Sequence, residues 1–351
     1  MKKKVYLIFS LLGFSPLMAA NPASHGNIDG SAGHNIPIKL PPIIGGLAPN
    51  LSLQYNSEGE MGFFGKGWRL DGVDYIRKHP FGKSIGHTGS DSYVLAPQQT
   101  RLIAKDISRT EFHASVYDEV LYKPDYSNSW VTGEPSFWRA HMPNGQIREY
   151  GKTYESFLEA IAYFYDGDEF YYNGTPAKNW YLNKVSDPHG NYYDLSYMKS
   201  RGEVYPGRIT LNGNTQSSKK YYVDFSYLYD HASIAVTYNG GETDRRYFIS
   251  EIRVSQDCYL VLTCTIRRYR LTYGTLGSTK EKVLTRVEET SDDGTIEQFW
   301  DLTYTDPDIS SRAFVSHGIG SGFPQFDYTT LVAAPPFSNG DFNGDGIDDV
   351  F

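Results

Sequence analysis

Residues 180–197, WYLNKVSDPHGNYYDLSY, contain two strand-like segments on either side of a turn. In each segment, apolar or aromatic residues alternate with polar residues, which is the pattern of a strand with one buried face. The central residues 187–191, DPHGN, preset a bend or tolerate positive φ. Residues 282–299 repeat this outline around the turn at 292–294, DDG. Two related hairpins indicate a growing antiparallel sheet.

The same alternation extends over most of the chain. β-branched and aromatic residues fill the alternating runs, as is typical of strands. The further runs lie at 51–55, 221–227, 268–273 and 299–304, and further turn signals lie at 143–145, 212–214 and 239–241. The sequence therefore predicts an all-β fold in which many antiparallel hairpins form a β-sheet-rich sandwich or shell-like domain.

One segment also fits a helix. Phe157, Leu158 and Ile161 have roughly helical spacing within residues 155–164. The neighbouring runs YFY at 163–165 and FYY at 170–172 instead resemble the two strands of a long hairpin insertion. A short helix and a Tyr-rich hairpin are both left open here.

Composition predicts a folded, acidic protein. The 351 residues are 40% hydrophobic and 15% aromatic, which supplies enough apolar surface to offset the entropy of folding. The formal net charge of −8 argues against nucleic acid and anionic lipid as partners, because phosphates repel an acidic surface. Acidic residues with Gly and Asn nearby suit calcium better.

Residues 1–20 are predicted to be a secretory signal peptide. Lysines at 2–4 precede an apolar run over 5–18 that is too short to span a bilayer, and Ala19 and Ala20 follow it. A retained amphipathic anchor is the alternative. The signal peptide predicts an exported protein, either periplasmic or extracellular, with no stable membrane insertion after cleavage.

The remaining chain divides by composition. Gly, Pro, Ser and Ala are frequent in residues 21–35 and 306–340, which predicts a flexible leader and a linker. The compact β-rich domain is therefore expected over 36–305, and a short truncated loop follows at 341–351.

That last loop has the spacing of a calcium site. Oxygen-bearing side chains lie at loop positions 1, 3, 5 and 9, a backbone carbonyl at position 7, and glycine at position 6. The predicted ligands are the side chains of Asp341, Asn343, Asp345 and Asp349 and the carbonyl of Ile347. An ordinary Asp/Asn/Gly turn is the alternative, since no residue occupies position 12.

The two cysteines, Cys258 and Cys264, could form a disulfide in an exported chain. If residues 258–264 formed one extended strand, the sulfur atoms would lie about 20 Å apart, too far to bond. A disulfide therefore requires a turn between them, and the sequence leaves this question open.

Enzyme motifs are weak in this chain. Residues 82–86, GKSIG, match the G-x-S-x-G pattern that exposes a nucleophilic serine, here Ser84. No apolar strand precedes this segment and no helix pattern follows it, so an ordinary hairpin loop is favoured. The nine histidines include no H-E-x-x-H motif, which argues against zinc catalysis. The sequence predicts no enzyme activity.

Several ordered motifs resemble one known family. The segments IPIKLPP at 36–42, GGLAPNLSLQYNS at 45–57 and GKGWRL at 65–70 are similar to the opening of the SpvB-type N-terminal domain. That domain begins the B components of insecticidal toxin complexes and many RHS/YD-repeat proteins. Residues 180–197 resemble a YD-type hairpin, and residues 341–349 resemble the first FG-GAP/VCBS calcium loop of the family.

The resemblance implies a scaffold rather than a catalyst. In the family this β-rich domain helps to form, with a following propeller and RHS shell, a container around a toxic C-terminal segment. It implies a non-catalytic structural module whose partners are downstream RHS or toxin domains or toxin-complex subunits. The prolines in 36–42 exclude a helix and favour an extended edge strand, and Trp68 between glycines is expected to anchor the core.

Two other functions compete with the scaffold. The Tyr-rich insertion at 154–172 suits a secreted glycan-binding or surface-binding module, because aromatic rings stack on sugars. A hydrolase that uses Ser84 is the third hypothesis.

Overall fold

The computed structural model describes most of residues 31–304 and a few short segments outside them. The described ranges are 2–7, 25–26, 31–79, 92–116, 118–127, 134–159, 163–166, 169–172, 177–200, 203–214, 219–238, 241–258, 263–277, 280–304, 339–340 and 349–350. The chain divides into two compact units, Met1–Pro307 and Asp308–Phe351. Almost all of the described secondary structure is β, which confirms the predicted fold class.

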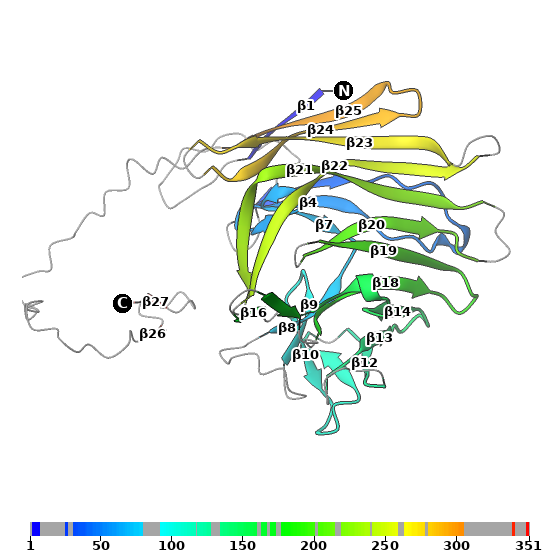
Figure 1. Ribbon diagram of the computed structural model, residues 1–351. Helices are drawn as coiled ribbons and strands as arrows, with labels where there is room; N and C mark the ends of the chain where they lie inside the picture. Colours follow the sequence, from blue (N-terminus) through cyan, green and yellow to red (C-terminus); the bar gives the residue numbers. More distant parts are fainter. Residues whose placement is uncertain are drawn as a thin grey trace, which may run out of the picture. The chain divides into compact units, whose positions relative to one another are not determined.

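Eight strands of the first unit close into a barrel. Each strand pairs antiparallel with the next, and the ring closes where Ile76 of the first strand pairs with Trp180 of the last. The strands are β8 (Tyr75–His79), β9 (Ser92–Ala96), β10 (Thr100–Ala104), β11 (Phe112–Ala114), β12 (Leu121–Asp125), β13 (Phe137–His141), β14 (Ile147–Tyr150) and β18 (Ala177–Ser186) (Figure 1).

The last barrel strand also begins a long antiparallel sheet. Residues 179–181 of β18 pair with β8, whereas residues 184–186 pair with the following strand, so β18 belongs to both assemblies. The long sheet continues through β19 (Tyr192–Ser200), β20 (Glu203–Leu211), β21 (Tyr221–Tyr238), β22 (Gly241–Asp257), β23 (Thr263–Thr275), β24 (Lys282–Ser291) and β25 (Ile296–Tyr304). Strand β1 (Lys2–Leu7) pairs parallel with β25 at the far edge (Figure 1).

Local chemistry explains the hairpin between β18 and β19. Asp187 Oδ1 accepts hydrogen bonds from the backbone N–H groups of His189 and Asn191, each at 2.9 Å. Gly190 has a φ of +80°, which L-residues with a Cβ rarely adopt. The DPHGN turn therefore bends the chain as its residues predict.

A smaller sheet forms near the N-terminus. Its strands are β2 (His25–Gly26), β3 (Ala32–Pro37), β4 (Ser52–Asn56) and β7 (Trp68–Asp71). The 3-10 turn η1 (Ile44–Gly46) lies between β3 and β4, and the hairpin of β5 (Met61–Gly62) and β6 (Gly65–Lys66) precedes β7. Strand β3 begins at Ala32, inside the expected leader, and pairs with β2 and β4. Pairing with β2 is limited to Ala32 and Gly33, so Ile36 and Pro37 lie at the sheet edge, as expected for 36–42, but the strand ends at Pro37.

Aromatic side chains fill the centre of the barrel. Trp138 and Trp180 are fully buried, and their ring centroids lie 6.0 Å apart at 74°. Tyr93 packs edge-on against both indoles, at 4.8 and 5.8 Å. Such edge-to-face pairs add about 0.5–1.5 kcal/mol each to the free energy of burial.

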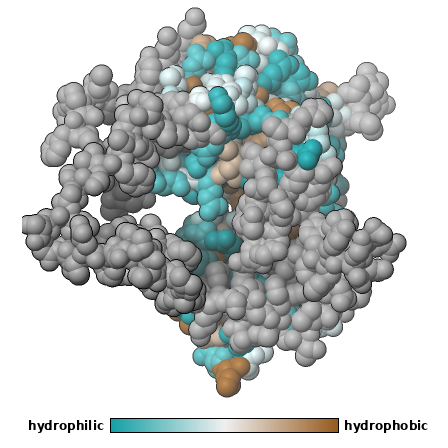
Figure 2. Space-filling view, turned by 60° about the vertical axis from the view of Figure 1, so that its left-hand side comes forward, coloured by the Kyte–Doolittle hydropathy of each residue, from teal (hydrophilic) through white to brown (hydrophobic). Residues whose placement is uncertain are grey.

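On the face in Figure 2, hydrophilic residues cover most of the described surface.

The described residues within 155–164 do not form the helix considered from the sequence. This segment begins with the 3-10 turn η2 (Tyr154–Ser156), which is followed by β15 (Phe157–Glu159) and by the hairpin of β16 (Tyr163–Asp166) and β17 (Glu169–Tyr172). Thr153 N–H donates to Ser156 Oγ at 3.0 Å, which closes the turn locally. Phe157 then pairs with Trp180 of β18, so sheet pairing overrides the helical spacing, and the hairpin alternative is confirmed.

Candidate functional site

The predicted calcium ligands lie mostly outside the described residues. Asp341, Asn343, Asp345 and Ile347 are not described, whereas the backbone of Asp349 lies in β27 (Asp349–Val350) and pairs with Gly340 of β26 (Asn339–Gly340). In the parts of the chain that the structure describes, no group of three or more His, Cys, Asp or Glu side chains is arranged to hold a metal ion. Calcium binding at 341–349 stays a prediction.

The serine motif also lies outside the described residues. Residues 80–91, which include Ser84, have no described structure. In the Tyr-rich insertion, side chains are described for residues 154–158, whereas the β16–β17 hairpin is described by its backbone alone. No described contact therefore bears on the hydrolase hypothesis.

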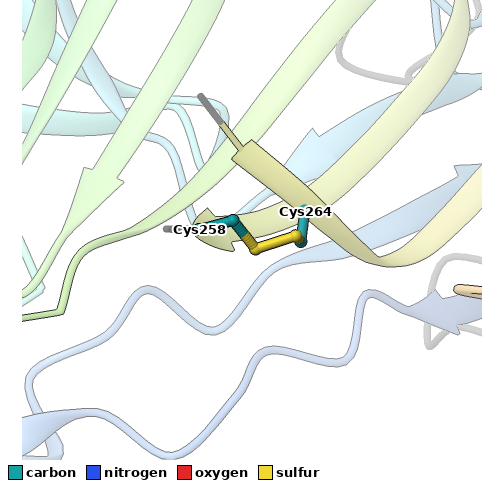
Figure 3. Close-up of a disulfide and its surroundings, with 2 residues drawn as sticks. All are labelled: Cys258 and Cys264. Carbon is teal, nitrogen blue, oxygen red and sulfur yellow. A yellow bond between two sulfur atoms is a disulfide. The ribbon is translucent and has the colours of Figure 1, made fainter. Parts of the chain in front are cut away.

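Cys258 and Cys264 form a disulfide at the end of the β22–β23 hairpin (Figure 3). Their Cα atoms lie 5.7 Å apart, because the chain turns between β22 and β23 and places Gln256 opposite Cys264. The antiparallel pairing of β22 and β23 means that the chain reverses direction between the two cysteines, as this bond requires. The disulfide joins two neighbouring strands of the long sheet covalently.

A buried carboxylate binds the N-terminal segment, residues 31–71, to the long sheet. The Glu289 side chain in β24 is fully buried, and Lys39 Nζ lies 2.8 and 3.0 Å from its two oxygens. Arg267 in β23 forms ion pairs with both Glu289 and Glu297. The backbone N–H of Lys39 donates to Tyr269 Oη at 2.9 Å. We call Lys39, Arg267, Tyr269 and Glu289 the seam cluster.

Burial and the neighbouring carboxylate raise the pKa of Tyr269 well above its usual value. The phenol of the seam cluster is therefore neutral at physiological pH and keeps its proton for hydrogen bonding. Two cations around one carboxylate satisfy the buried charge, as a buried ion pair requires. The cluster is built to position a chain segment, and its groups are already paired with one another.

Trp68, in the core, makes a second contact between the N-terminal segment and the long sheet. Its indole is 1% exposed, which confirms the expectation from the glycine-flanked tryptophan. Trp68 Nε1 donates to Tyr304 Oη at 2.8 Å, and Tyr304 Oη donates in turn to the carbonyl of Leu284 at 2.6 Å. This relay connects β7 with both β25 and β24.

A third contact lies at the β5–β6 hairpin. Arg245 and Glu203 pair at 3.1 Å with both side chains 6% exposed, and Arg245 also donates to the carbonyl of Met61. Ile249 N–H donates to the carbonyl of Phe63 at 3.0 Å. The N-terminal segment is thus hydrogen-bonded to the long sheet at β22, β23, β24 and β25, which fixes it across the sheet.

A separate buried group lies in the barrel. Asp74, just before β8, accepts hydrogen bonds from Arg148 at 2.9 Å and from Tyr150 Oη at 3.1 Å. Its backbone carbonyl accepts from Leu182 N–H at 3.2 Å. Burial raises the pKa of Asp74, and the Arg148 guanidinium opposes that rise. Asp74 therefore joins β8, β14 and β18 where the barrel closes.

Sequence reasoning missed the seam cluster and the Asp74 cluster. Lys39 belongs to the quoted segment 36–42, but nothing in the sequence pairs it with Glu289, which lies 250 positions later. The one available signal for Glu289 was its place on the apolar face of an alternating strand. A carboxylate there needs a partner from elsewhere in the fold.

Comparison with known proteins gives one family match. Residues 26–252 match the family described as Salmonella virulence plasmid 65kDa B protein. The comparison with curated proteins finds no match.

Solved structures share the fold at low sequence identity. The N-terminal domain of effector protein SpvB from Salmonella typhimurium strain LT2 is 17% identical, with a TM-score of 0.57, and the alignment covers 73% of this chain and 98% of that one. The TcdB2-TccC3-TEV structure is 16% identical with a TM-score of 0.62, covering 82% of this chain and 16% of that one. A Photorhabdus luminescens Tc holotoxin pore is 16% identical with a TM-score of 0.60, covering 80% and 15%.

The chain spans 15% to 17% of the length of these toxin-complex chains, so the comparison concerns one portion of them. The family match, in contrast, covers more than half of this chain and includes the N-terminal sheet, the barrel and the long sheet as far as β22. The chain therefore belongs to the Salmonella virulence plasmid 65kDa B protein family.

Proposed function

We propose that this chain is a non-catalytic structural module of a secreted bacterial toxin or RHS-type protein, contributing β-structure to a shell that encloses or presents a toxin segment. The observation that carries the proposal is the N-terminal segment fixed across the long sheet by the seam cluster and the Trp68 relay. A scaffold requires such rigid cross-connections. The polar groups of the seam cluster bond to each other, which suits support rather than turnover.

The comparisons support the same proposal. Solved structures of toxin assemblies, TcdB2-TccC3 among them, share this fold. The expected partners of this chain are accordingly downstream RHS or toxin domains, or toxin-complex subunits. Export by residues 1–20 and calcium at 341–349 belong to the proposal as further expectations. Within the described residues, no helix is both long and apolar enough to cross a membrane.

Cross-linking in the native host tests the scaffold role. The chain is purified with its assembly, cross-linked, and analysed by mass spectrometry. We expect cross-links between the long sheet and chains or domains that carry YD repeats. A stable monomer without such cross-links, in cells that produce the toxin, would contradict the proposal.

A glycan-binding module is the second candidate. Tyr154 is 65% exposed and packs edge-on against Phe157, with Lys199 Nζ 3.9 Å from the Tyr154 ring centroid. An exposed ring beside a cation is a surface on which a sugar could stack. Retention on a glycan array should be lost in Tyr154→Ala if this candidate is correct, and unchanged retention would remove it.

A further inference from the structure

Strand β25 forms the last antiparallel strand of the long sheet, and its outer edge accepts a strand from the other end of the chain. The six residues of β1 pair with residues 299–304 in parallel (Figure 1). Every other pairing among the described strands is antiparallel. A parallel neighbour cannot come from a tight hairpin, so the edge accepts a segment that is remote in sequence.

The register shows which part of β25 depends on this neighbour. Pairing with β24 extends along β25 as far as Asp301, opposite Arg286. Residues 302–304 continue beside β1, with Leu302 opposite Val5 and Tyr304 opposite Leu7. The backbone of this end is therefore presented mainly to the added strand.

The side chains of β25 hold this edge in place. Trp300 and Leu302 are 4% and 5% exposed and belong to the core, and Tyr304 receives the Trp68 hydrogen bond. Thr303 between them is exposed. The edge is an extended backbone whose outer side pairs with β1, and an edge of this kind is the template that strand addition uses.

Strand β1 lies inside the predicted signal peptide. Its removal on export would leave the outer N–H and C=O groups of β25 without their strand partner. Exposed strand edges are rarely left uncovered, because they can pair with a strand of another chain or domain. The exported protein therefore needs another occupant for the same position.

We propose that the outer edge of β25 is a strand-acceptor site that, in the exported protein, pairs in parallel with an extended segment of an adjoining shell domain. This inference rests on the proposed function. The register of β1 indicates the chemistry of the occupant: a basic residue opposite Asp301 and apolar residues opposite Leu302 and Tyr304. A basic residue complements the carboxylate of Asp301, and apolar residues extend the apolar face of the sheet.

Peptide binding to the exported protein tests the site directly. The protein is purified after export, its N-terminus is read by mass spectrometry, and fluorescein-labelled KKKVYL, the sequence of residues 2–7, is titrated by fluorescence anisotropy. Alternate amides of a strand point to the same edge. We therefore compare two N-methylated peptides, one methylated at the odd positions and one at the even positions.

Strand addition predicts an asymmetric result. One N-methylated peptide should bind at least about tenfold more weakly than the parent, since it loses several backbone hydrogen bonds, and the other should bind within about twofold. The chain that retains residues 1–20 should bind the parent peptide more weakly than the exported chain, because β1 fills the edge. Absence of saturable binding, or equal losses for both methylated peptides, would overturn the inference.

A photo-cross-linker at the exposed position Thr303 identifies the natural occupant. We expect it to label a YD-repeat or RHS-type segment in the native host. Labelling of a second copy of this chain, or an exported protein that keeps residues 2–7 with protected β25 amides, would refute the proposed occupant. The peptide titration needs no shell protein, so its failure is distinguishable from failure of the scaffold proposal.

Discussion

Removal of the buried carboxylate of the seam cluster, by Glu289→Ala, should destabilise the first unit strongly. Breaking a buried ion pair costs about 3–5 kcal/mol when the partner charge stays buried. Here Lys39 is 49% exposed and Arg267 is 21% exposed, so both cations regain water when the carboxylate is lost. The expected decrease in the free energy of unfolding is therefore lower, about 2–3 kcal/mol.

The measurement is chemical and thermal unfolding followed by circular dichroism. A loss of this size should lower the melting temperature by about 4–12 °C in a unit larger than 150 residues. Glu288→Ala is the matched control, because the adjacent Glu288 lies on the opposite face of β24, 24% exposed and paired with Arg286. That variant should lose less than about 1 kcal/mol.

Two further results would distinguish the mechanism. Glu289→Gln should recover part of the stability, because an amide oxygen still accepts from Lys39 and Tyr269. Limited proteolysis should cut Glu289→Ala faster within residues 38–50, which the seam cluster holds against the sheet. Equal stability losses in Glu289→Ala and Glu288→Ala would refute the assignment of the seam cluster as a fastening point.

Three other predictions concern separate parts of the first unit. Replacement of both Cys258 and Cys264 by serine should lower the free energy of unfolding by about 2 kcal/mol, from the entropy of the short closed loop, and the parent protein should lose the same amount on reduction. Gly65→Ala should cost more than Gly190→Ala in urea unfolding: both have positive φ, but a Cβ at Gly65 would lie 2.8 Å from a backbone oxygen of β24, whereas nothing lies within 4 Å at Gly190. The folded-state pKa of Asp74 is raised, so its contribution to stability should fall as pH rises from its unfolded pKa, near 3.8, through the folded value. The measurement is the free energy of unfolding of the parent relative to Asp74→Asn as a function of pH. A difference that grows with pH in the parent's favour would contradict this prediction.

Much of the local structure could be predicted from the sequence. Alternation and turn residues act over a few positions, so the strands around the DPHGN turn and their hairpin follow from residues 180–197 alone. The core role of Trp68 was predictable for the same reason, from the glycines near it in the sequence. At 155–164 the sequence left a helix and a hairpin open, because Phe157, Leu158 and Ile161 have roughly helical spacing whereas the neighbouring runs resemble strands. The ladder to β18 decided between them.

Most of the functional site depends on contacts between remote residues. The functional class came from motif resemblance, whereas the seam cluster and the Asp74 cluster were absent from every sequence argument. Glu289 and Lys39 each satisfy an ordinary local pattern, and their pairing exists only once β24 and the N-terminal segment are packed. The disulfide could be predicted only in part. The sequence showed that the bond requires a reversal of the chain between Cys258 and Cys264, and the β22–β23 hairpin provides that reversal.

By itself, therefore, the sequence determined an all-β chain of antiparallel hairpins, since side-chain period and turn chemistry are properties of neighbouring residues. Only the tertiary structure decided that Ile76 meets Trp180 to close a barrel, that β18 also pairs with the first strand of the long sheet, and that β25 offers an edge to a remote strand. Hydrogen bonds between strand edges are nearly the same for every sequence. Their partners are therefore chosen by the packing of side chains from distant parts of the chain, such as the edge-to-face indoles of the barrel.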